Sequence, residues 1–110
     1  MTRSIERITK EGRVNFAIKH RKSQNFQILF HSLWDEVSKD VMDVAREWEK
    51  GDGNEILLTV NSWDLPHAFM AFKVTKAPCL VLCKRGRITK QDYVPLIYKH
   101  FETRTSNGAG

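Results

Sequence analysis

The chain has 110 residues, of which 41% are hydrophobic and 28% are charged, and its formal net charge is +5. These proportions are typical of one globular domain and exclude a disordered chain. No apolar stretch reaches the roughly 20 residues of a membrane span, and the first residues lack the apolar segment of a signal peptide. We therefore expect a cytoplasmic protein without a membrane partner. If the sequence is an excised part of a longer secretory protein, the endoplasmic reticulum lumen is the alternative.

The first half of the chain predicts two helices and a strand. Residues 12–23 fit a helical period better than an alternating one, so we interpret them as a helix. Residues 26–31, FQILFH, are apolar and favour a strand. From Asp35 to Lys50 apolar residues recur at helical spacing, and two glycines follow directly. This pattern predicts a helix that ends before Gly51.

The second half repeats the alternation of strand and helix. Residues 55–60, EILLTV, are expected to form a strand covered on both faces. Pro66 then starts a short helix, and residues 79–83, CLVLC, form a third strand. A basic turn follows, and a short strand at 87–88 is the alternative to a direct connection to the last helix. Thr89 and Asp92 resemble a capping box, which predicts that the last helix starts there and runs to Phe101.

This order predicts an α/β domain of three layers, in which helices flank a central mixed β-sheet. We expect a single domain over residues 1–101, followed by a flexible tail over 102–110. Trp48 and Trp63 are expected to pack in the core or half-buried.

The two cysteines do not predict a disulfide or a metal site. Cys79 and Cys83 are four residues apart, or roughly 13 Å along a strand, whereas a disulfide needs Cα atoms within about 7 Å. The four histidines are scattered along the sequence, so no zinc-ligand spacing arises and we expect neither a metal nor a cofactor. Cys83 is interpreted as a small core residue.

Two segments resemble the thioredoxin superfamily. VTKAPCLVLCKRG, residues 74–86, is similar to the family strand that begins at a cis-proline, and ILFHSLWDEVSK, residues 28–39, is similar to the segment that carries the redox motif. Phe30, Trp34 and Lys39 match the family there, but Asp35 and Ser38 stand where it has its two cysteines. The resemblance implies a thioredoxin-like fold over about residues 5–101, a cis bond before Pro78 and a redox-inactive member.

A further likeness connects residues 64–74, DLPHAFMAFKV, with domains of the protein disulfide isomerase group, many of which lack the redox motif. The resemblance implies a module that binds or scaffolds another protein. Dithiol–disulfide oxidoreductase activity is not expected. The contact surface of such a binding module would lie around the cis-proline and the start of the main helix, at Trp34, Asp35, Ser38, Ala77, Pro78 and Cys79.

Two other functions remain open. Cys79 is a weak catalytic candidate for a monothiol oxidoreductase or thiol sensor, although a nearby Asp35 carboxylate would raise its pKa and disfavour the thiolate. The chain is also basic in residues 1–26 and 73–100, so a nucleic-acid accessory domain is a third hypothesis. No recognisable nucleic-acid motif accompanies these charges, which makes that partner the less favoured one. For Asp35 itself, the pattern predicts the N-cap of the helix.

Overall fold

The computed structural model describes residues 3–10, 13, 26–53, 55–84 and 87–105 of the chain. Five strands within these residues form one sheet in the order β1-β3-β2-β4-β5. Their bounds are β1, Ser4–Arg7; β2, Phe26–His31; β3, Ile56–Asn61; β4, Cys79–Lys84; and β5, Arg87–Gln91. Strands β1, β3 and β2 run parallel, whereas β4 is antiparallel to β2, and β5 is antiparallel to β4. The predicted mixed sheet is therefore confirmed.

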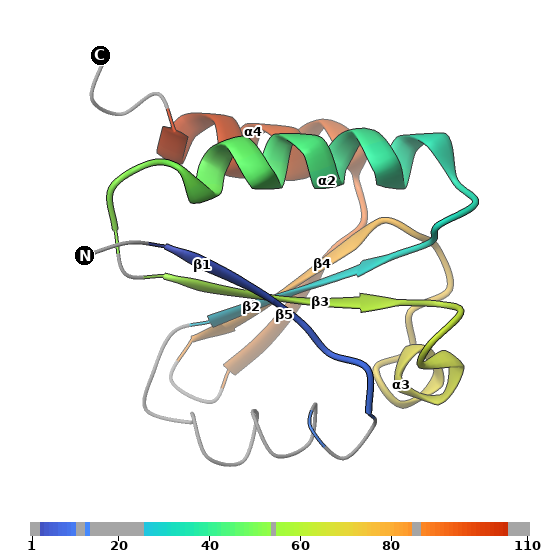
Figure 1. The fold of residues 1–110 in the computed structure, drawn as a ribbon. Coiled ribbons are helices and arrows are strands. Elements are labelled where there is room, and N and C mark those ends of the chain that lie inside the picture. The colour runs from blue at the N-terminus through green and yellow to red at the C-terminus, as the bar shows by residue number, and fades with distance from the viewer. Residues whose placement is uncertain (1–2, 11–12, 14–25, 54, 85–86, 106–110) are drawn as a thin grey trace.

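Helices cover both faces of this sheet (Figure 1). Their bounds are α2, Glu36–Glu49; α3, Pro66–Ala71; and α4, Val94–Thr105. Helices α2 and α4 lie side by side on one face, and α3 lies on the other face, close to where β3 ends. The α/β class predicted from the sequence is confirmed. None of the helices in the described part of the chain combines the length and hydropathy of a membrane span.

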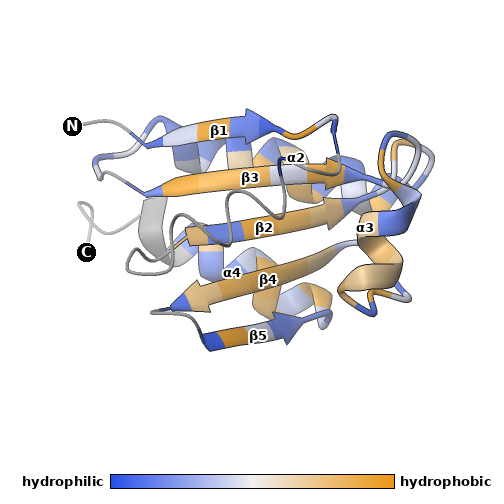
Figure 2. Ribbon diagram, turned by 90° about the horizontal axis from the view of Figure 1, so that it is seen from below, coloured by the Kyte–Doolittle hydropathy of each residue, from blue (hydrophilic) through white to orange (hydrophobic). Residues whose placement is uncertain are grey.

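Two apolar clusters, one on each face, hold the layers together. Successive side chains of a strand point to opposite faces, so Phe30 packs toward α3 while its neighbour Leu29 packs beneath α2 and α4. On the two-helix face, Trp48 of α2 meets Phe101 of α4, with ring centroids 5.6 Å apart. Figure 2 shows the consequence in the sequence: the middle strands are mostly hydrophobic, whereas the edge strands β1 and β5 carry hydrophilic ends.

Strand β1 was not predicted from the sequence. It is a four-residue edge strand in which Ile5 is the one hydrophobic residue, so it carries too little alternation to be recognised. Its position depends instead on partners far along the chain. The Ser4 N–H donates to the Glu55 carbonyl over 3.1 Å, and the Ile5 N–H donates to the Glu49 carboxylate over 2.9 Å.

The expected start of the last helix at Thr89 was wrong. Thr89 lies inside β5, opposite Leu82 of β4, and α4 begins at Val94. The hairpin pairing of β4 with β5 outweighs the local capping pattern, because it continues the sheet through five residues of β5.

The predicted tail from residue 102 also starts too early. Helix α4 continues to Thr105, since neither glycine nor proline interrupts the chain there. The remaining residues, 106–110, lie outside the described part. The helix predicted over 12–23 likewise lies outside the described residues, apart from Arg13.

Candidate functional site

Three segments meet at one edge of the sheet, which we call the His31 edge. It is the edge at which β2 ends at His31, β3 ends at Asn61 and β4 begins at Cys79. Because Phe30 is paired with Cys79 in the antiparallel register, the chain just after β2 lies opposite the chain just before β4. The loop into α2, the turn after β3 and the segment that enters β4 therefore meet at this edge (Figure 1).

Asp35 caps the start of α2, as predicted. Its Oδ2 atom accepts hydrogen bonds from the Ser38 N–H over 3.0 Å and from the Ser38 hydroxyl over 3.1 Å. The Ser38 Oγ in turn accepts the N–H of Ser32 over 3.2 Å, and the Ser38 side chain is fully buried. Asp35 and Ser38, at the two positions where the resemblance places cysteines, are thus hydrogen-bonded to each other at the helix N-cap, and neither carries a thiol.

Trp34 and Trp63 form an exposed aromatic pair beside this cap. Their side chains are 76% and 69% exposed, and the rings meet edge to face with centroids 6.4 Å apart. The expectation that Trp63 packs in the core or half-buried was wrong. Asn61 turns the chain outward, because its Oδ1 atom accepts the N–H groups of Trp63 and Asp64, both over 2.9 Å. Leu65 enters the core instead of Trp63.

The segment before β4 brings backbone to the same edge. The Ala77–Pro78 peptide bond is cis, as the resemblance implied. Pro78 is buried and Ala77 half-buried. Among the hydrogen bonds of the described residues, none uses the N–H or the carbonyl of Ala77. This residue therefore presents one donor and one acceptor that a further chain could pair with.

Cys79 is turned away from the helix start. Its side chain is 3% exposed and belongs to the apolar cluster on the α3 face, together with Phe30 and Val60. Burial, and secondarily the Asp92 carboxylate, raises the pKa of the thiol. The direction agrees with the prediction, but the carboxylate responsible is Asp92 rather than Asp35. A buried thiol of raised pKa is poorly suited to nucleophilic chemistry.

Cys83 is a core residue in the same apolar cluster, and burial raises its pKa to about 11. Both cysteines are free thiols. No group of three or more potential metal-binding side chains occurs within the described ranges.

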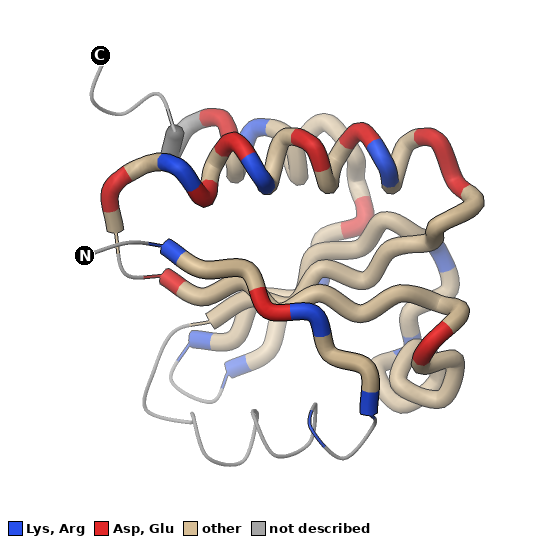
Figure 3. Tube along the Cα trace, in the orientation of Figure 1, with Lys and Arg blue, Asp and Glu red and all other residues tan. Residues whose placement is uncertain are grey.

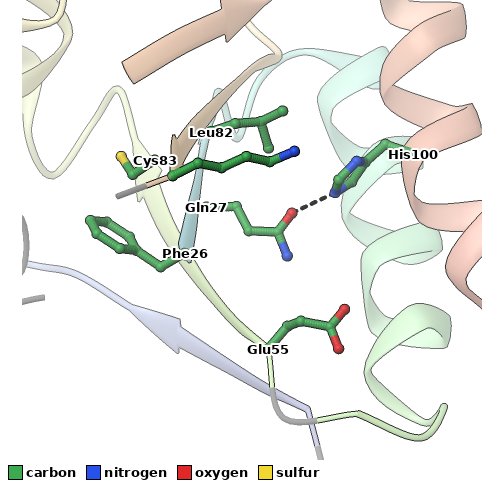
Figure 4. Close-up of a pocket in the computed structure, with 7 residues that line it drawn as sticks. Phe26, Gln27, Glu55, Leu82, Cys83 and His100 are labelled. Carbon is green, nitrogen blue, oxygen red and sulfur yellow. Dashed lines mark hydrogen bonds between the residues drawn. The ribbon is translucent and has the colours of Figure 1, made fainter. Parts of the chain in front are cut away.

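Two pockets in the described part of the chain lie at opposite edges of the sheet. The smaller one, of about 40 Å³, is lined by Phe26, Gln27 and Glu55, and there Gln27 is hydrogen-bonded to His100 of α4 (Figure 4). The larger one, of about 300 Å³, is at the His31 edge beside α2. Its existence was not predicted, because it depends on how α2 packs over the end of β2.

His31 forms part of the larger pocket. Burial, together with the nearby Arg7 and Arg46 guanidinium groups, lowers its pKa to about 4, against the opposing effect of Asp64. The imidazole is therefore neutral at physiological pH.

The basic segments behind the nucleic-acid hypothesis are only partly described. Most of residues 1–26 lies outside the described ranges. Of the second segment, Lys90 is engaged in the fold: its ammonium donates to the carbonyls of Phe72 and Lys73 over 3.1 and 3.2 Å. These carbonyls belong to the C-cap residue of α3 and to the residue after it, so the lysine of β5 is bonded to the chain just past the end of that helix.

The sequence matches no protein-family model and no curated protein, but the fold matches solved structures of thioredoxins. Thioredoxin from Schistosoma mansoni is 12% identical, with a TM-score of 0.76 over 91% of this chain and 94% of that chain. Thioredoxin from Fasciola hepatica is 17% identical, with a TM-score of 0.76 over 91% and 96%. Mitochondrial thioredoxin 3 from Saccharomyces cerevisiae, in its oxidised form, is 17% identical, with a TM-score of 0.73 over 89% and 93%. The chain therefore has a thioredoxin-like fold.

Proposed function

We propose that this chain is a redox-inactive thioredoxin-like domain that binds an extended segment of another protein at the His31 edge. The observation that carries the proposal is the exposed pair of Trp34 and Trp63 at the same edge of the sheet as the unpaired backbone of Ala77. The solved thioredoxin structures support the fold of this chain and not its activity, since they are only 12% and 17% identical to it.

The absence of a usable dithiol supports the redox-inactive part. Thiol–disulfide exchange needs an accessible thiolate and a second thiol that resolves the mixed disulfide. Asp35 and Ser38 have no sulfur, and the chain's two cysteines are buried thiols with raised pKa values. The helix start that would lower a thiol pKa is occupied by the Asp35 carboxylate.

The tryptophan pair supports the binding part. Tryptophan is enriched among the residues that dominate binding energy, because a large rigid ring is buried at a small cost in side-chain entropy. Trp34 and Trp63 are already held against each other, which limits that cost further. At the same edge, the Ala77 N–H and carbonyl can hydrogen-bond to an extended segment, as in strand addition. The rings would provide affinity and the backbone would fix the direction of the bound segment.

A selected peptide tests this proposal even while the natural partner is unidentified. Peptides that bind the wild-type chain are selected from a random display library, and the dissociation constant of one of them is measured by calorimetry. We expect the double variant Trp34→Ala, Trp63→Ala to weaken binding by at least roughly tenfold, since each ring loses its contact area. Ile88→Ala is the matched control, because Ile88 is also apolar and 47% exposed. It lies at the end of β5 that points away from the His31 edge. Equal affinities of the double variant and wild type would refute the site.

An insulin-reduction assay tests the redox part separately. We expect no turnover above background, whereas an active thioredoxin run in parallel reduces insulin. Turnover that is lost in Cys79→Ser would replace the proposal with the monothiol function. Turnover that persists in that variant would point to Cys83 or to a contaminant, and the Cys83→Ser variant separates these two.

A further inference from the structure

The pocket at the His31 edge has two kinds of wall. It lies between the end of β2 with the residues that follow and the side of α2 from Lys39 to Arg46, and it has a volume of about 300 Å³. Leu33 and Met42 provide apolar surface, whereas Lys39 and Arg46 bring ammonium and guanidinium groups from one side of α2. Figure 3 shows that basic positions alternate with acidic ones along α2. A volume of this size is at the lower end of the range for small-molecule sites.

His31 is a polar group in this pocket without a partner. Its side chain is only 7% exposed, and no hydrogen bond within the described part of the chain involves its imidazole. Its ring nitrogens are not fully buried, since the one fully buried side-chain nitrogen or oxygen without a partner among the described residues is Trp48 Nε1. The neutral ring has one N–H to donate. This N–H is open to an acceptor on a ligand in the pocket.

The two cations of the pocket, Lys39 and Arg46, can leave their present ion pairs to bind a ligand. Lys39 is paired with Glu36 over 3.3 Å and Arg46 with Asp43 over 3.1 Å, each three residues apart on the helix surface. All four side chains are more than half exposed, and such pairs contribute little to stability. Arg46 also lowers the pKa of His31, so its positive field reaches the imidazole.

We propose that this pocket binds a small organic anion, in which a carboxylate or phosphate group is carried on an apolar body. The oxyanion accepts hydrogen bonds from Lys39, Arg46 and the His31 N–H, and the apolar body packs on Leu33 and Met42. Asp43 also lines the pocket and Glu36 is paired with Lys39 just outside its lining, so the bound oxyanion competes with these two exposed carboxylates for the cations. This inference does not depend on the proposed peptide binding, since it uses neither tryptophan nor the Ala77 backbone.

Three related probes test the pocket by NMR titration of the isotope-labelled chain. Phenylacetate and phenyl phosphate carry the two candidate anions, and phenylacetamide is a neutral compound of nearly the same shape as the first. We expect saturable shifts of the His31 ring and of the amides of Leu33 and Met42 with at least one of the anions. Phenylacetamide should bind at least about tenfold more weakly, because charge-assisted hydrogen bonds are lost. If the amide binds as well as both anions, or if no probe gives saturable shifts, the proposal is wrong.

Variants of α2 separate this site from general attraction to a basic protein. Arg46→Gln should weaken the bound anion about tenfold, and Lys39→Gln should act in the same direction. Lys50→Gln is the matched control: Lys50 forms an equally exposed pair with Glu47, three residues apart, but does not line the pocket. An equal loss of affinity in Lys50→Gln and Arg46→Gln would overturn the site in favour of unspecific charge. His67→Gln, at an exposed histidine outside the pocket, should change nothing.

Discussion

The two ends of α2 each carry a tryptophan, but their surroundings are opposite. At the C-terminal end, Trp48 is fully buried against Phe101, with the Arg3 guanidinium 5.0 Å from the ring centroid. At the N-terminal end, Trp34 is 76% exposed and touches only the equally exposed Trp63 among the aromatic contacts of the described residues. One end of the helix thus anchors the fold, and the other presents the surface that we propose for binding.

The caps of the helix follow the same division. At the exposed end, the Asp35 carboxylate accepts the N–H and the hydroxyl of Ser38, three residues along the chain. At the buried end the Trp48 carbonyl accepts from the Arg3 guanidinium over 2.8 Å, across 45 positions in the chain. The exposed end can therefore change its partners without loss of the core, whereas the buried end cannot. Substitutions at each end test this contrast.

The largest effect is expected for Trp48→Ala. Removing a fully buried tryptophan leaves a cavity and deprives Arg3 of its aromatic neighbour, so we expect a loss of about 3 to 5 kcal/mol in the free energy of unfolding. Urea denaturation followed by far-UV circular dichroism measures this loss. Trp63→Ala is the matched control, and at an exposed site we expect a change within about 0.5 kcal/mol. Comparable losses in the two variants would contradict the division between the ends.

Much of the fold could be predicted from the sequence, because buried elements carry periodic apolar patterns. The strand at 26–31 has the predicted bounds, and the predicted helix over 35–50 contains α2 with its two cap residues. Elements held by distant partners were missed or misplaced. Strand β1 depends on Glu55 and Glu49, and β5 extends over Thr89 because β4 pairs with it. Such contacts leave no local pattern.

The candidate site was predictable only where a short motif encodes it. Asp35 at the helix start follows from its neighbouring residues, whereas the cis bond at Pro78 before β4 was implied by the family resemblance of residues 74–86. The outward direction of Trp63 depends on the Asn61 side chain, which holds the turn after β3. The Asn-x-x-Asp spacing of Asn61 and Asp64 was a signal that could have indicated this turn. The pocket at His31 has no such signal, since it arises from the packing of α2.

A smaller effect is expected from the titration of His31 beneath the exposed half of α2. Its pKa is about 4 in the folded chain and about 6.5 in the unfolded chain, so between these values only the unfolded chain binds the proton. Stability should therefore fall as the pH is lowered from about 6.5 to 4. The linkage amounts to about 3 kcal/mol at most. Arg7 and Arg46 oppose protonation and Asp64 favours it, which leaves burial as the main cause.

Urea denaturation at several pH values measures this dependence in wild type and in His31→Gln. The variant should lose the extra slope between pH 6.5 and 4, while the titration of carboxylates remains in both proteins. His67→Gln should keep the slope, because His67 is exposed. If wild type and His31→Gln show the same pH dependence, His31 is not buried in its neutral form.

The smallest effect is expected at the N-cap of α2, in Asp35→Ala. This change removes the acceptor of the Ser38 N–H and hydroxyl, and loss of an N-cap costs about 1 kcal/mol in the free energy of unfolding. Asp35→Asn should recover most of this loss, because asparagine is also a good N-cap. Asp40→Ala is the control within the same helix, where replacing an exposed aspartate by alanine should be neutral or slightly stabilising. Urea midpoints of the four proteins distinguish these outcomes. A loss in Asp35→Ala as large as that in Trp48→Ala would mean that the N-terminal end of α2 also anchors the fold. Partner binding could then not rearrange this end without a loss of stability.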